Sequence, residues 1–332
     1  CLNCTTRGAR SVSDYQILVE NILQLLVTGV LIGAIYGMMC VGLAMIFGIM
    51  RVINFAQGDF MMVGMYATYF VFTALGFQAL FGSAIGPYLS VAAAAPAMFL
   101  FGWLIHRFLI RSVTGRRSSG MEGDGHYAQL ILTLGVALIL QNGAMILVGA
   151  DLVSIRTPLS SEAWVLEPFG ESLPALLFFN KSRVIAAILS AIVIIALWLL
   201  IQRTFLGKSL RAAADNAEAA TYMGIDVDRA HRIAFALGTA VTAMAGGLLA
   251  TNYPFSPFVG LEYVIIMYAG VVLGGIGSVI GAFWGGMIIG LVQQFSTLVL
   301  PTQLQNATIF VCFLLVVMLR PQGLFGRNVE RT

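Results

Sequence analysis

Residues 17–50 read ILVENILQLLVTGVLIGAIYGMMCVGLAMIFGIM, an apolar run whose only charged side chain is Glu20. A hydrocarbon core about 30 Å thick needs about 20 apolar residues per helix. The run is therefore longer than one span requires, and it contains five glycines. We expect two spans here, at 17–36 and 38–50, the second short and broken near Arg51.

The rest of the chain continues this apolar character. Of its 332 residues, 59% are hydrophobic and only 10% are charged, whereas soluble domains carry about 25% charged residues. A water-soluble globule of this size is thereby excluded, and a net charge of +3 is too small for a nucleic-acid-binding protein. We predict an all-α, polytopic transmembrane helical bundle of about 8–10 spans, some broken or re-entrant. The further spans are expected at 59–81, 86–106, 127–149, 183–201, 231–250, 262–276, 278–299 and 307–319.

Basic residues orient the spans, because short loops rich in Lys and Arg stay in the cytoplasm. They concentrate in segments 107–117 and 202–232 and after residue 319. The connection 150–182 is more acidic and contains three prolines, so it is expected to face outward as an ordered loop. With ten spans the N-terminus would be cytoplasmic.

These assignments give one membrane domain with two tails. Residues 1–16 are interpreted as an N-terminal tail that need not be the native start, 17–320 as the membrane domain and 321–332 as a cytoplasmic tail. Cys1 and Cys4 form a C-x-x-C pair, but no second pair or His cluster accompanies them, so we expect no metal site.

The cytoplasmic connection 202–230 carries the most specific signal. Residues 203–232 read RTFLGKSLRAAADNAEAATYMGIDVDRAHR, and 209–223 are rich in good helix formers. Its expected apolar stripe comprises Leu210, Ala213, Ala214, Ala217, Ala220 and Tyr222 or Met223, with Arg211, Asp215 and Glu218 beside it. Gly224 is placed to end the helix in a left-handed conformation. Such a helix suits docking to a soluble partner, and the alternative is a helix lying on lipid headgroups.

The residues Glu218-Ala219-Ala220 followed by Gly224 resemble the EAA loop of ABC importer permeases, the coupling helix that contacts the ATPase. The Leu-Pro ending of that pattern is absent. Longer stretches resemble the permeases for branched-chain amino acids, and most closely their H-type membrane subunit. They are 33–37, RVINFAQGD at 51–59, LILQN at 138–142, AADN at 213–216, MGID at 223–226, VLGGIGSVIGA at 272–282 and RPQGLFG at 320–326.

The resemblance implies a bacterial inner-membrane importer. It would contain a second homologous permease subunit, two cytoplasmic ABC ATPase subunits and a periplasmic substrate-binding protein, surrounded by membrane lipid. The chain itself would be no enzyme and bind no cofactor, with ATP and Mg used by the partner ATPases. Its sequence contains no G-x-x-x-x-G-K-[ST] phosphate loop, which independently agrees with this division of labour. Coupling would rest on Arg211, Asp215, Glu218, Ala219, Ala220 and Gly224.

Polar residues at membrane depth suggest function by default. Asn54, Gln57 and Asp59 form the densest group, and Gln141 with Asn142 forms another. Asn54 and Gln57 either line the translocation path or serve structure, and Asp59 can cap the following helix through its dipole. For Gln141 and Asn142, bonding to neighbouring helices is the main alternative to path lining.

Glycines repeat at four-residue spacing near the end of the chain. Gly274, Gly277, Gly281 and Gly285 are expected to let helices approach closely, either within this chain or against a second permease. The stretch 274–277 is also an expected break between helices.

Substrate class stays open at the level of sequence. The same fold would serve permeases for urea, short amides or aromatic acids, and an autonomous secondary carrier or channel is the rival from another class. The absence of acidic residues deep in the later spans argues against proton coupling.

Overall fold

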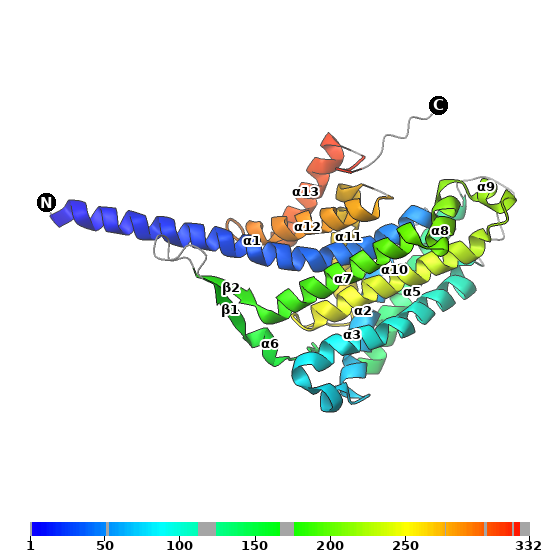
Figure 1. Cartoon of the computed structure of the whole chain (residues 1–332), viewed down its shortest axis with the longest axis horizontal. Coiled ribbons are helices and arrows are strands. Elements are labelled where there is room, and N and C mark those ends of the chain that lie inside the picture. Colours follow the sequence, from blue (N-terminus) through cyan, green and yellow to red (C-terminus); the bar gives the residue numbers. More distant parts are fainter. Residues whose placement is uncertain are drawn as a thin grey trace.

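The computed structural model describes residues 2–50, 53–111, 124–166, 176–275, 277–301, 304–320 and 322–325, with the backbone alone for 2–16 and 124–127. The fold is a helical bundle with one small hairpin (Figure 1). Its elements are α1 (Leu2–Met50), α2 (Gln57–Thr73), α3 (Phe77–Ile105), η1 (His106–Ile110), α5 (Asp124–Val148), α6 (Pro158–Ser161), β1 (Ala163–Leu166), β2 (Leu177–Asn180), α7 (Lys181–Arg203), α8 (Phe205–Asp215), α9 (Ala217–Tyr222), α10 (Val227–Ala250), α11 (Val259–Gly274), α12 (Val279–Ser296) and α13 (Gln305–Leu319).

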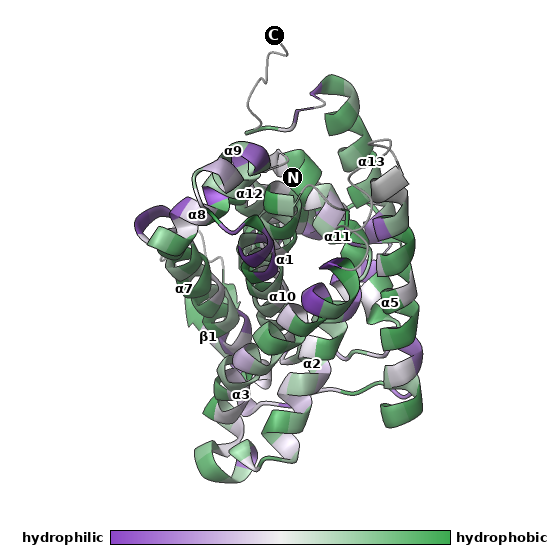
Figure 2. Cartoon of the chain, turned by 90° about the vertical axis from the view of Figure 1, so that its right-hand side faces the viewer, coloured by the Kyte–Doolittle hydropathy of each residue, from purple (hydrophilic) through white to green (hydrophobic). Residues whose placement is uncertain are grey.

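Among the described residues, six helices are long and apolar enough to cross a membrane, and the shorter apolar helices α11 and α13 accompany them. The predicted all-α polytopic fold is confirmed. Helices α1 and α10 are mostly buried within the chain, whereas few residues of α5 and α7 are buried. The exposed helices are strongly apolar, as expected of surfaces that face lipid (Figure 2).

The first apolar run forms one continuous helix, so the prediction of two spans at 17–36 and 38–50 is wrong. Its glycines are contact points rather than breaks. A Cβ on Gly33 would lie 2.8 Å from the Met287 carbonyl oxygen, and one on Gly37 would collide with the Phe283 ring. Small residues let membrane helices approach without interrupting either helix. The expected break at Arg51 lies outside the described residues.

This correction changes which end of the bundle contains the N-terminal part. Gln24 of α1 bonds the backbone of Phe178, within the connection predicted to face outward. The other end of α1 lies beside α8, in the basic connection predicted to be cytoplasmic. The start of the span and the connection 150–182 therefore lie at the same end of the bundle, whereas counting ten spans predicted opposite sides, because one helix replaces two.

The second and third spans also differ from their expected bounds. The predicted span 59–81 ends at Thr73, and α3 begins at Phe77 after Gly76. Gly76 has φ +72°, which glycine adopts without the cost of a side chain. Within α3, Gly82 has φ +74° and divides a first turn from the long helix that was predicted at 86–106.

The connection 150–182 contains the antiparallel hairpin β1–β2, whose register pairs Ala163 with Asn180. Gln24 completes the edge of β2. Its Nε2 donates to the Phe178 carbonyl oxygen, and its Oε1 accepts from the Phe178 amide, both at 2.9 Å. The side chain thus replaces a neighbouring strand and joins the hairpin to α1.

The segment after α13 returns to the end of α11. Leu324 N donates to the Leu273 carbonyl oxygen at 2.8 Å, and Phe325 N donates to that of Gly274 at 3.2 Å. These bonds satisfy carbonyl groups that a helix C-terminus leaves unpaired. Residues 322–325 therefore lie at the same end of the bundle as the turn between α11 and α12. The rest of the predicted tail, 326–332, lies outside the described residues.

Candidate functional site: two short helices and the buried polar cluster

The basic connection 202–230 folds into two short helices, α8 and α9, at one end of the bundle (Figure 1). We expected a single helix over 209–223. That prediction is wrong, because the backbone at Asn216 is extended, with φ −150° and ψ 105°, and interrupts the helix. Its side-chain oxygen accepts a hydrogen bond from Ala219 N at 3.0 Å and thus caps α9. Asparagine is a strong N-cap residue, and here its preference exceeds the helix propensity of the alanines on either side.

The inward face of the two helices follows the predicted stripe in part. Leu210, Ala213 and Ala220 are buried, and α8 packs against α7, α10 and α1. Ala217 is exposed, which follows from the new helix starting at this point. Tyr222 and Met223 were expected on the stripe but are 87% and 82% exposed.

The end of α9 agrees with expectation. Gly224 adopts φ +79°, and Ile225 N donates to the Ala220 carbonyl oxygen at 3.0 Å. Glu218 lies in the first turn of α9, where its negative charge interacts favourably with the positive end of the helix dipole. Both Glu218 and Ala219 are exposed. The Glu-Ala-Ala residues therefore lie on a short helix, on which Glu218 and Ala219 are exposed and Ala220 is buried.

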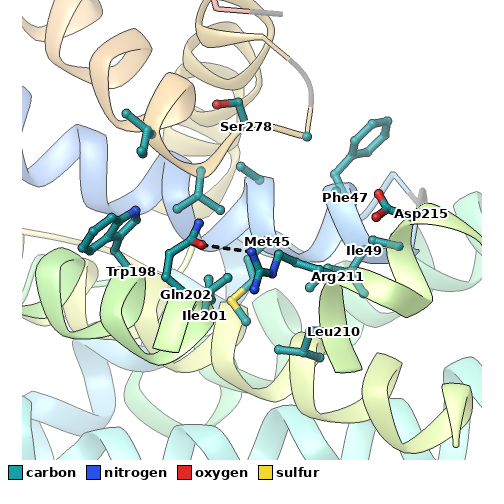
Figure 3. A pocket seen from close by; sticks show the side chains of 16 residues that line it. Met45, Phe47, Ile49, Trp198, Ile201, Gln202, Leu210, Arg211, Asp215 and Ser278 are labelled. Carbon is teal, nitrogen blue, oxygen red and sulfur yellow. Dashed lines mark hydrogen bonds between the residues drawn. The ribbon is translucent and has the colours of Figure 1, made fainter. Parts of the chain in front are cut away.

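A cleft of about 740 Å³ lies behind α8, between the end of α1, the end of α7 and the turn before α12 (Figure 3). Two of the predicted coupling residues, Arg211 and Asp215, line this cleft, and both are exposed. Arg211 Nη1 donates to Gln202 Oε1 at 2.9 Å. Asp215, one turn further along α8, lies beside Phe47 and Ile49 (Figure 3).

The buried polar cluster lies at the start of α2. Asn54 and Gln57 have no exposed surface. Asn54 Nδ2 donates to Gln57 Oε1 at 3.1 Å, and Gln57 Nε2 donates to Thr242 Oγ1 at 2.6 Å, near the middle of α10. Asn54 Oδ1 also accepts from Ala56 N. In this conformation the two amides hold α2 against α10, as the structural role predicts. A role of Asn54 and Gln57 in lining the translocation path stays a prediction.

Asp59 lies in the first turn of α2, as the dipole interpretation expects. Gln141 Nε2 of α5 donates to its Oδ1 at 2.9 Å, which confirms the expected bond between neighbouring helices. Asn142 instead bonds Leu138 within α5 and is exposed. The pair predicted together is thus divided: Gln141 faces the cluster, and Asn142 faces away.

The predicted glycine stripe divides in a similar way. Gly274 and Gly281 lie against each other, and Gly285 lies against Gly270, so these glycines join α11 to α12 within the chain. Gly277 belongs to the turn instead, with φ +87° and nothing within 4 Å of the place its Cβ would take. The expected helix break at 274–277 is confirmed by the ends of α11 and α12.

Sequence reasoning missed the partners of the predicted residues. Thr242 and Gln202 each complete a side-chain hydrogen bond, yet an isolated Thr or Gln in an apolar helix carries no local signal. The exposed positions of Tyr222 and Met223 could have been found by treating Asn216 as a helix cap. In the part of the chain that the structure describes, no three His, Cys, Asp or Glu residues form a group that could hold a metal ion.

Comparison with known proteins finds a protein family that matches most of the chain. Residues 25–319 match the model described as the branched-chain amino acid transport system permease component. The chain is 30% identical to the branched-chain amino acid permease BraD of Pseudomonas aeruginosa, over 94% of this chain and 99% of that protein. It is 29% identical to LivH of Escherichia coli, over 93% and 97%. It is 24% identical to the autoinducer 2 import permease LsrD of Salmonella paratyphi B, over 84% and 86%. No solved structure matches the chain.

Proposed function

We propose that this chain, which belongs to the branched-chain amino acid transport permease family, forms the inner-membrane path of an importer for branched-chain amino acids. Six long apolar helices and the family establish a multi-pass membrane permease. Two relatives, BraD and LivH, carry branched-chain amino acid transport in their names and cover nearly the whole chain. They support the substrate class, with urea, short amides and aromatic acids as the alternatives.

The proposed partners are two cytoplasmic ATPases, a second permease subunit and a periplasmic binding protein. The observation that carries this proposal is the exposed tip of α9. Tyr222 and Met223 expose large apolar surfaces beside Glu218 at the basic end of the bundle, which is the end predicted to be cytoplasmic. Aromatic and Met side chains are enriched in protein interfaces, so this tip suits a groove on an ATPase.

The proposed mechanism is alternating access, with α8 and α9 as the coupling element. Helix α8 packs against α7, α10 and α1, which are three of the long spans. A displacement of α9 by a closing ATPase dimer would reach these spans through α8. Because Leu210 and Ala213 anchor α8 by burial, the pair of helices would move the spans rather than slide over them.

The first experiment changes the tip of α9. Tyr222→Asp and Glu218→Lys with Gly224→Pro should each abolish most ATP-dependent leucine uptake in proteoliposomes containing the assembled transporter. Loss of one interface anchor costs about 2 kcal/mol or more, which is roughly a thirtyfold loss of ATPase affinity. Copurification of the ATPases reports that loss directly.

Phe205→Asp is the matched control, because Phe205 is 81% exposed in the same connection but lies at the start of α8. It should retain the ATPases. Normal uptake by the α9 variants would refute the coupling role. Competition of labelled leucine uptake by valine but not by urea should mark the substrate class, and competition by urea alone would favour the alternative.

A further inference from the structure

The cleft behind α8 continues into an apolar groove on the side of the bundle. The groove lies between α7 and α12 and is lined entirely by apolar and aromatic residues: Ile194, Ile195, Trp198, Val279, Ile280 and Phe283. Trp198, Val279 and Ile280 line the cleft as well. The two hollows therefore adjoin, and together they are called the channel here: it is polar beside Arg211 and Asp215 and apolar over residues 194–198 of α7 and 279–283 of α12.

The polar end contains a cation and an anion that do not neutralise each other. Arg211 and Asp215 are four residues apart on α8, yet the ion pairs among the described residues do not join them. Arg211 turns toward Gln202 instead, and Asp215 lies near Phe47 and Ile49 (Figure 3). A bound group with a negative and a positive part would complement both.

We propose that this channel binds an aminophospholipid of the inner leaflet. Its phosphate would contact Arg211, its ammonium group would face Asp215, and one acyl chain would lie along the groove between Trp198 and Val279. Arginine forms charge-assisted hydrogen bonds with phosphate oxygens, and Trp side chains favour the membrane interface. A free amino acid would satisfy the charges, but its short side chain would leave most of the groove empty.

The experiment is native mass spectrometry of the assembled transporter, purified in mild detergent and supplied with phosphatidylethanolamine or phosphatidylglycerol. Phosphatidylethanolamine should be retained. Arg211→Gln and Ile280→Trp, which fills the groove, should each lower its retention at least fivefold. Asp215→Asn should abolish the preference for phosphatidylethanolamine over phosphatidylglycerol.

Two control variants separate this channel from general lipid adhesion. Lys208→Gln removes an exposed cation of the same helix, and Ile146→Trp alters an exposed position on α5. Both should retain the lipid. Equal retention in all variants would overturn the proposal, as would displacement of the lipid by free leucine or a crosslink that places the second permease in the groove. None of these outcomes depends on transport, so failure of the proposed function would be seen separately.

Discussion

At the scale of single residues, the contact between Gln57 and Thr242 joins two helices through a buried hydrogen bond. Gln57→Leu should leave the Thr242 hydroxyl without its partner and lower the free energy of unfolding by about 1–2 kcal/mol. Thr242→Val removes the other partner with little change of shape. The double variant should cost less than the sum of the single variants, measured by thermal unfolding in detergent. Strict additivity would mean that the bond contributes nothing.

The same residues test path lining. Asn54→Leu with Gln57→Leu should slow leucine uptake more than Thr242→Val, while the ATPases still copurify. If the three residues serve structure alone, uptake should follow stability in all variants. Unchanged uptake in the double leucine variant would remove the path from this cluster.

The sequence predicted these polar residues but not their geometry. Asn54, Gln57 and Asp59 were identifiable because amides and carboxylates are rare at membrane depth. Their partners Thr242 and Gln141 lie 185 and 82 residues away. No local pattern specifies which helix face meets which, so the cluster could be named in advance but not assembled.

At the scale of elements, α1 and α12 meet through glycines. A Cβ on Gly286 would lie 2.6 Å from the Gly37 Cα atom. Gly286→Ala should therefore separate the helices and lower the melting temperature, even though alanine favours helix by about 1 kcal/mol over glycine. The matched control is Gly143→Ala in α5, where nothing lies within 4 Å of the added Cβ. It should be neutral or slightly stabilising, and equal effects at the two positions would contradict the packing argument.

Glycine also explains the main error in the predicted elements. Five glycines in 17–50 are compatible either with a break or with a close contact, and composition does not distinguish the two. The structure shows the second. The opposite error occurred in 209–223, where good helix formers predicted one helix and the capping side chain of Asn216 began another. Most other spans were located correctly because long apolar runs admit few alternatives.

At the scale of the whole molecule, the single first helix fixes the orientation of everything after it. The Gln24–Phe178 bonds place the start of α1 beside the hairpin, and the basic residues of 202–232 predict that α8 and α9, at the other end of the bundle, lie in the cytoplasm. Counting ten spans from sequence gave the opposite side for the start of the chain. One span more or fewer inverts that assignment, so the error in one element became an error in topology.

Cysteine labelling decides between the two orientations. In a background with the four native cysteines replaced by serine, Asn21→Cys at an exposed position of α1 should react with a membrane-impermeant maleimide from the periplasmic side. Lys208→Cys, exposed on α8, should react only after the inner membrane is permeabilised. Reaction of both cysteines from the same side would contradict the arrangement in which residues 17–50 form one continuous span. Labelling of Asn21→Cys only after permeabilisation, with the same result for Lys208→Cys, would restore the two-span arrangement of 17–50.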